Sequence, residues 1–214
     1  GNLYAEGTEG TRPEIYIQGN RNPYRISIDQ KNGFLYWGEV GPDANEDSFE
    51  TRGPRGYDEL NQARKAGNYG WPYFVGNNYP YREFDYATGK SGAAFDPMEP
   101  VNNSVNNTGR KNLPALAPAF IWYPYGESKE FPQLGTGGRN AMAGPIYYSD
   151  MYSADTKFPD YYDSKVFIYD WIRGWIKAVT LKENGDYDKM EAFMPNTKFN
   201  AIIDMEMGPD GRIY

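Results

Sequence analysis

The sequence predicts an all-β fold, because its composition and its turn residues are those of many short strands. The 214 residues include 20 Tyr, 24 Gly and 16 Pro, and aromatic residues make up 17% of the chain. Aromatic side chains favour strands, whereas Gly and Pro mark the turns between them. No segment has the pattern of a long helix. Short strands at this turn spacing are typical of a propeller or a sandwich.

The first half of the chain is organised around residues 20–72. Two alternating segments, Ile26–Asp29 and Phe34–Val40, flank an Asn-Gly turn, which is strong hairpin chemistry. Arg21 and Asn22 precede the first strand, and Gly41-Pro42 follows the second. A strand cannot continue its ladder through proline, so carbonyl groups are freed there. We therefore expect polar side chains and free carbonyls on one rim of this hairpin.

The remaining elements follow from the same patterns. We expect residues 1–214 to form one domain, in which residues 77–112 are an irregular surface excursion. The other expected elements are strands at Arg12–Ile17, Ala119–Tyr123 and Pro145–Ser149, a short helical turn at Glu59–Ala66, and a hairpin that joins Lys165–Trp171 to Trp175–Leu181.

Charge and missing residue types exclude several classes of function. The net charge of −7 argues against nucleic acid and anionic membranes as partners, and no apolar run is long enough for a membrane span. The chain has no Cys, so it forms no disulfide. It also has no His, which removes the commonest general base.

The C-terminal residues Met205–Tyr214 repeat the pattern of the hairpin Ile26–Tyr36. Ile26 and Met205 are 179 positions apart. At about 45 residues per propeller blade, this distance predicts roughly four blades. A hairpin that stopped within its second strand would leave an unpaired edge, so we expect the natural protein to continue beyond Tyr214.

Several short motifs, in this order, resemble the soluble pyrroloquinoline quinone (PQQ)-dependent sugar dehydrogenases, also called glucose/sorbosone dehydrogenases. They are Arg21-Asn22-Pro23, Gly41-Pro42-Asp43, Asp58-Glu59-Leu60-Asn61 and Gly67–Pro72, and the segments Gly138–Pro145 and Phe158–Gly185 fit the same family. The resemblance implies a six-bladed β-propeller. It also implies oxidation of an aldose or related carbohydrate with PQQ and calcium, in the periplasm or as a secreted protein.

The resemblance also implies which residues form the site. Arg21 and Asn22 would orient cofactor and sugar, and the Gly41 and Pro42 carbonyls would hold a calcium ion that bridges to the quinone. Calcium binds oxygen donors of this kind. The carboxylates of Asp43 and Asp58 are near enough in sequence to add to the metal site, although an acidic loop of this kind is also typical of a solvated surface.

Two further arginines, Arg139 and Arg173, are expected to contact the cofactor. Arg173 lies in a run that departs from the family, whose bend carries Lys-Arg-Gly where this chain has Ile172-Arg173-Gly174. An aliphatic side chain at Ile172 cannot pair with a quinone carboxylate. The catalytic histidine of the family would lie upstream of Gly1.

Because the chain has no His and carries Ile172 at the lysine position, we expect this fragment alone to be inactive as a sugar dehydrogenase. Three interpretations of function are open. The first is a sugar dehydrogenase-like propeller that acts on a small carbohydrate. The second is a non-catalytic propeller of a larger secreted protein, which binds carbohydrate or another domain of the same protein. The third is a calcium-dependent hydrolase such as a lactonase, which would need central Asp, Asn or Glu ligands from several blades.

Overall fold

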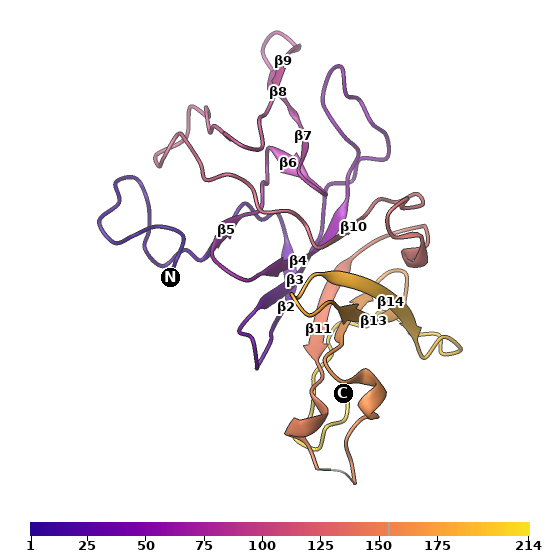
Figure 1. Cartoon of the computed structure of the whole chain (residues 1–214). Coiled ribbons are helices and arrows are strands. Elements are labelled where there is room, and N and C mark those ends of the chain that lie inside the picture. Colours follow the sequence, from indigo (N-terminus) through magenta and orange to yellow (C-terminus); the bar gives the residue numbers. More distant parts are fainter. Residues whose placement is uncertain (154) are drawn as a thin grey trace.

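The computed structural model describes residues 1–153 and 155–214, and almost all of its regular structure is β (Figure 1). Two four-stranded antiparallel sheets dominate it. The first has the order β10-β4-β3-β2, and the second has the order β11-β12-β13-β14. Their strands are β2 (Pro23–Ile28), β3 (Leu35–Glu39), β4 (Asp58–Ala63) and β10 (Ile121–Tyr123), then β11 (Ala141–Ile146), β12 (Val166–Asp170), β13 (Ile176–Leu181) and β14 (Tyr187–Phe193).

Three two-stranded sheets and three short 3₁₀ helices complete the described elements. The paired strands are β1 (Ile17–Gln18) with β5 (Gly67–Asn68), β6 (Phe74–Val75) with β7 (Tyr79–Pro80), and β8 (Arg82–Asp85) with β9 (Lys90–Ala94). The 3₁₀ helices are η1 (Pro132–Leu134), η2 (Ser149–Met151) and η3 (Asp160–Tyr162).

The two large sheets are consecutive blades of a β-propeller. Each is a four-stranded antiparallel sheet, and β11 of the second packs beside β2 and β3 of the first (Figure 1). Stacked four-stranded sheets of this kind are the repeating unit of propellers. The predicted all-β propeller class is therefore confirmed.

The described residues form two four-stranded blades and the start of a third. The spacing of the two hairpins in the sequence predicts roughly four blades. The reason is an insertion. Between β4 and β10, residues 64–120 leave the first blade and return to it, so this blade consumes many more residues than its strands need. The C-terminal repeat forms a bridge between Met207 and Ile213, and Met205 packs against the second blade.

Alternation along the strands distributes apolar side chains to three layers of core. Tyr36 and Leu60 face the second blade and pack with Val166 and Ile168. The intervening Trp37 faces the opposite side of the first blade. Phe167 and Tyr169 alternate with Val166 and Ile168, and they pack with Met205 on the far face of the second blade. The period of two along each strand is what produces these layers.

Four local predictions differ from the structure. The strand predicted at Arg12–Ile17 is wrong for most of its length, because only β1 at Ile17–Gln18 is a strand. The helical turn predicted at Glu59–Ala66 is wrong, because Asp58–Ala63 is strand β4, paired on both sides by β3 and β10. The strand predicted at Pro145–Ser149 begins earlier, as β11 at Ala141–Ile146. Residues 77–112 contain the β8–β9 hairpin and are less irregular than predicted. At Glu59–Ala66, pairing with the neighbouring strands overrides a weak local preference for helix.

Among the residues that the structure describes, no helix is long and apolar enough to cross a membrane.

Close packing of the two blades gives the first testable prediction. A Cβ added at Gly38 would lie 2.0 Å from the Ala141 carbonyl oxygen and 2.6 Å from the Met142 Cα, both backbone atoms of β11. Because backbone cannot swing aside as a side chain can, Gly38→Ala should lower the free energy of unfolding by about 2 kcal/mol or more. Urea denaturation would measure this loss.

The matched control is Gly126→Ala. A Cβ at Gly126 meets nothing within 4 Å, so its substitution should leave the free energy of unfolding nearly unchanged. Equal stability of the two variants would contradict the tight contact between β3 and β11.

Candidate functional site

A buried ion pair joins the two blades. Asp58 begins β4, and Arg139 lies just before β11, where its guanidinium donates from Nη1 to Asp58 Oδ1. The Asp58 carboxylate also accepts hydrogen bonds from the backbone amides of Gly41 (3.0 Å) and Ala141 (2.9 Å). Burial raises the pKa of Asp58, while Arg139 and the two amides act in the opposite direction. Three hydrogen bonds from both blades thus meet on one carboxylate.

The same arginine holds the Gly-Pro corner that the sequence singles out. Arg139 Nη2 donates to the Pro42 carbonyl oxygen at 2.6 Å, and the guanidinium lies 4.1 Å from the centre of the Tyr125 ring. The Tyr125 hydroxyl in turn donates to Asp43 Oδ1 at 2.5 Å. The Pro42 carbonyl, predicted to be free for a metal, therefore already has a strong donor.

Two glutamates occupy the other face of the first blade. Glu39 of β3 and Glu59 of β4 are direct cross-strand partners, and both are buried. Like charges directly opposite one another destabilise a sheet. No arginine or lysine of the described residues pairs with either carboxylate. The carboxylate oxygens of both glutamates accept hydrogen bonds from neutral groups only.

Each glutamate has its own set of neutral donors. Glu39 Oε1 accepts from the backbone amides of Arg21 and Asn22, both at 2.5 Å, and Glu39 Oε2 accepts from the Trp37 indole at 3.3 Å. The Gly76 amide donates to Glu59 Oε1 at 2.6 Å, and Asn61 Nδ2 donates to Glu59 Oε2 at 2.9 Å.

A small cavity separates these carboxylates. It is lined by Glu39, Glu59, Gly41 and Trp71 among others, and it offers about 10 Å³ to the centre of a water-sized sphere, close to the need of one water or ion. Burial raises the pKa of Glu59 to about 8, with the Glu39 charge adding to the rise, and burial also raises the pKa of Glu39. With its pKa near 8, Glu59 is largely protonated at neutral pH, so a cation bound in this space would have to displace that proton.

Arg21 and Asn22 lie at the rim beside this pair. Both residues are exposed, and their backbone amides are fixed by Glu39. The Arg21 side chain donates from Nη1 to the Val40 carbonyl at 2.8 Å and lies 5.6 Å from the Trp71 ring centre. Since this is the one hydrogen bond of its side chain to a described residue, most of its N–H groups face outward.

Arg173 is used differently from the prediction. Its five N–H groups donate to five backbone carbonyls, those of Pro124, Leu134, Gly135, Gly137 and Gly138, at 2.7–3.1 Å. The guanidinium also lies 4.7 Å from the Tyr123 ring centre. Asp170 fixes the turn by accepting from the amides of Ile172 and Arg173. Arg173 therefore anchors the loop before β11, and the Ile172 side chain beside it is 52% exposed.

The predicted site residues are thus only partly brought together. Hydrogen bonds form two neighbouring groups: Glu39 accepts from the amides of Arg21 and Asn22, and Arg139 joins Asp58 to the Gly41-Pro42 corner. Arg173 belongs to the adjacent turn. Asp43 is exposed and reaches the Arg139 group only through Tyr125. Within residues 1–153 and 155–214, no group of three or more Asp, Glu, His or Cys side chains is placed to hold a metal ion.

The pairing of Glu39 with Glu59 across β3 and β4 was not predicted from the sequence. The signal was present in the alternation of β3, where Trp37 and Glu39 share a face. No such signal was apparent for Glu59, because a short helical turn was predicted at Glu59–Ala66 and a helical residue has no cross-strand partner. Register makes the pair visible.

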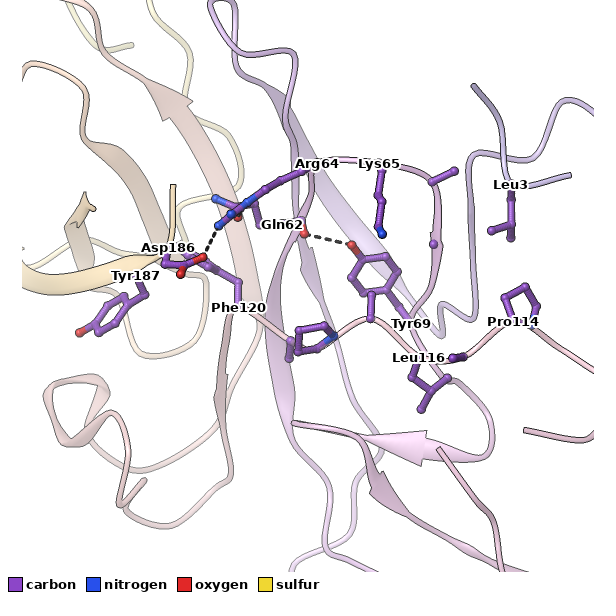
Figure 2. A pocket seen from close by; sticks show the side chains of 16 residues that line it. Leu3, Gln62, Arg64, Lys65, Tyr69, Pro114, Leu116, Phe120, Asp186 and Tyr187 are labelled. Carbon is purple, nitrogen blue, oxygen red and sulfur yellow. Dashed lines mark hydrogen bonds and ion pairs between the residues drawn. The ribbon is translucent and has the colours of Figure 1, made fainter. Parts of the chain in front are cut away.

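A second groove lies elsewhere, against the outer part of the first blade (Figure 2). Its volume is about 720 Å³, and it contains none of the predicted site residues. Two of its polar side chains, Tyr69 and Arg64, already have partners within the chain. Tyr69 donates to the Gln62 carbonyl at 3.0 Å, and Arg64 donates to Asp186 at 2.6 Å. This groove adds no chemistry to the site.

The raised pKa of Glu59 predicts a pH-dependent stability. Glu59 takes up its proton in the folded chain at about pH 8 but near its ordinary value of 4.5 when unfolded. Between these values the folded state binds more protons at Glu59, so the contribution of Glu59 to stability is most favourable below about pH 4.5 and is lost as the pH rises towards 8. Relative to wild type, Glu59→Gln should remove a slope of up to about 1.4 kcal/mol per pH unit.

Urea denaturation at several pH values between 5 and 8, in the presence of a chelator, would measure this slope. The matched control is Glu50→Gln, which changes an exposed glutamate and should run parallel to wild type. Parallel curves for wild type and Glu59→Gln would contradict the assignment.

Comparison with known proteins shows which family the chain resembles. The family model described as glucose / sorbosone dehydrogenase matches residues 2–111, about half of the chain. The aldose sugar dehydrogenase YliI of Escherichia coli is 27% identical over 209 residues, which are 96% of this chain and 41% of that protein. Quinoprotein glucose dehydrogenase B of Acinetobacter calcoaceticus is 30% identical over 118 residues, 50% of this chain and 22% of that protein.

Solved structures agree on the fold. The soluble aldose sugar dehydrogenase of Escherichia coli in its apo-form superposes with a TM-score of 0.54 at 20% identity, over 100% of this chain and 46% of that one. An oxidoreductase (glucose dehydrogenase) of Thermus thermophilus gives 0.53 at 20% identity, over 97% and 42%. The chain therefore spans less than half the length of these relatives. By its sequence and its propeller fold, the chain belongs to the glucose/sorbosone dehydrogenase family.

Proposed function

We propose that this chain is the part of a sugar dehydrogenase propeller that presents Arg21 and Asn22 to cofactor and sugar and holds a calcium ion beside them. The observation that carries the proposal is the buried Glu39–Glu59 pair, whose backbone partners include the amides of Arg21 and Asn22. A cation between the glutamates would stabilise the rim on which these two residues stand.

The donor set supports calcium. Calcium prefers oxygen ligands, above all carboxylates and backbone carbonyls. Glu39 and Glu59 supply two carboxylates that no cationic side chain of the described residues neutralises, and Gly41 lines the same cavity. In contrast, Arg139 engages Asp58 and the Pro42 carbonyl. The proposed cation position is therefore between the glutamates, in a cavity that Gly41 and Pro42 of the predicted metal set and Arg21 also line.

The cofactor proposal rests on Arg21 and Asn22. PQQ, when bound, would supply the acceptor for the two electrons that leave the sugar. Its carboxylates require cationic hydrogen-bond donors, and Arg21 offers outward-facing N–H groups at the rim. Arg173 has no N–H left to offer, and Arg139 uses both of its terminal nitrogens within the chain. Neither of these two fits a direct contact with the cofactor.

A second function, carbohydrate binding without oxidation, is favoured by one specific observation. Ile172 stands where the family carries lysine, and its aliphatic side chain is exposed beside an arginine that is already engaged. The chain also has no histidine to accept the proton of a sugar hydroxyl. The periplasmic or secreted location, and binding to other domains of the same protein, stay predictions from the resemblance.

Thermal unfolding of the chain with calcium, PQQ, both or neither tests the cofactor proposal. A ligand that binds only the folded state raises the midpoint by mass action. We expect calcium to raise the midpoint and PQQ to raise it further once calcium is present. Differential scanning calorimetry would measure both shifts.

Variants locate the ion. Glu59→Gln should abolish the calcium shift, whereas Asp43→Asn, a change at the exposed rim, should keep it. The reverse result would move the ion to the Gly41-Pro42-Asp43 corner. If no condition shifts the midpoint, the chain has neither site.

Because the 214 residues contain no histidine to accept the proton of the sugar, catalysis is tested on a complete propeller that contains this chain, by oxidation of aldoses in the presence of calcium, PQQ and an artificial electron acceptor. Loss of a charge-assisted hydrogen bond in Arg21→Ala should lower kcat/KM by about 10- to 100-fold. Arg12→Ala, which changes an exposed arginine outside the candidate site, is the control. Saturable sugar binding by that complete propeller, with no turnover in any condition, would instead support the non-catalytic function.

A further inference from the structure

One side chain closes the rim over the ion pair that joins the two blades. Tyr125 lies in the loop that leads from β10 to β11, and its ring covers the guanidinium of Arg139. The Tyr125 hydroxyl donates to Asp43, an exposed residue at the rim of the candidate site. We propose that Tyr125 is a gate, which its bond to Asp43 holds closed over Arg139 and whose rotation exposes the guanidinium at the rim.

Backbone forms the other walls around the guanidinium. A Cβ added at Gly56 would lie 2.6 Å from Arg139 Nη2, and one added at Gly41 would lie 3.3 Å from Nη1. Arg139 Nη2 also donates to the Pro42 carbonyl at 2.6 Å. Backbone cannot swing aside, whereas an aromatic side chain turns between staggered rotamers. The Tyr125 ring, whose centre lies 4.1 Å from the guanidinium, is therefore the wall that can open.

The backbone that carries the gate is fixed. The Tyr125 carbonyl accepts from the Gly137 amide at 2.9 Å, and the neighbouring Pro124 carbonyl accepts from Arg173 at 2.7 Å. A Cβ added at Gly126, the next residue of the loop, would meet nothing within 4 Å. Opening therefore needs the rotation of one half-buried side chain into open space and no rearrangement of the loop.

One hydrogen bond is the latch of the gate. Asp43 Oδ1, at 2.5 Å, is the one partner of the Tyr125 hydroxyl among the described residues. Asp43 forms no ion pair with any described Lys or Arg side chain. At the exposed rim, water competes for both groups, so the net free energy of the bond is small. Such a bond favours the closed state without locking it.

Opening changes what Arg139 can do. With the gate closed, Arg139 is 4% exposed, and its terminal nitrogens donate to Asp58 and to the Pro42 carbonyl. Its Nε has no partner among the described residues. Guanidinium groups bind anions through such donors. The gate thus keeps Arg139 from anionic groups at the rim, where Arg21 is exposed. It goes beyond the proposed function, because it needs neither the calcium ion nor the cofactor.

Phenylglyoxal, a reagent selective for accessible arginine, tests the gate on the purified 214-residue chain. Peptide mass spectrometry follows the modification of Arg139, with the exposed Arg12 as internal reference. In the wild type we expect Arg139 to react much more slowly than Arg12. Tyr125→Phe keeps the ring and removes the latch, so Arg139 should react about three- to tenfold faster than in the wild type.

Asp43→Ala removes the other half of the latch. It should speed the reaction of Arg139 as much as Tyr125→Phe does. The double variant should be no faster than either single variant, because both substitutions break the same bond. Additive effects would overturn the latch. An unchanged Arg139 rate in both single variants, or a wild-type Arg139 as reactive as Arg12, would overturn the gate itself.

The matched control is Tyr161→Phe. It removes a hydroxyl that donates to the Glu191 carboxylate at 2.6 Å on the second blade, and it should leave the Arg139 rate unchanged. Arg173, whose guanidinium is bound to five backbone carbonyls, reports general loosening of the fold. A parallel rise at Arg173 in Tyr125→Phe would assign the effect to unfolding and overturn the gate. Since calcium and PQQ are absent, failure of the gate and failure of the proposed function are distinguishable.

Discussion

The ion pair between Asp58 and Arg139 is the contact on which the rest of the site depends. Asp58 is 0% exposed and Arg139 is 4% exposed, so both charges have been removed from water. Hydrogen bonds to the buried charges offset much of this cost, although Arg139 Nε has no partner among the described residues. Here the carboxylate receives the guanidinium and two backbone amides, one from each blade. The pair therefore sets how the Gly41-Pro42 corner of the first blade sits against β11 of the second.

The Glu39–Glu59 pair has the opposite electrostatic character. Asp58 has a cationic partner, whereas the two glutamates face each other across neighbouring strands with neutral donors only. Sheets normally avoid this arrangement, and places where a sequence breaks a local rule are often functional. An ion bound between the carboxylates would remove the repulsion. The same ion would rigidify the backbone of Arg21 and Asn22, which links metal binding to the geometry of the rim.

An arginine at the position of a family motif does not by itself show that it contacts the cofactor. Arg173 fits the family motif in the sequence, yet every one of its N–H groups is spent on carbonyls of the chain itself. This use holds the glycine-rich loop 135–138 that leads to Arg139, so Arg173 supports the ion pair indirectly. Arg21, in contrast, keeps most of its donors outward. The structure thus separates two arginines that the motif alone treats alike.

The sequence by itself determined the all-β class and the hairpin of residues 26–39, because strand alternation and Asn-Gly turns are local properties of the chain. The order of its short motifs likewise determined the family and the rim that carries Arg21 and Asn22. Only the tertiary structure decided that Glu59 pairs with Glu39, that Arg139 neutralises Asp58, and that the insertion at residues 64–120 turns four expected blades into two and the start of a third. These outcomes depend on strand register and on contacts between residues about 20 to 80 positions apart. Residues so distant in sequence leave no local pattern, since their partners are chosen by packing.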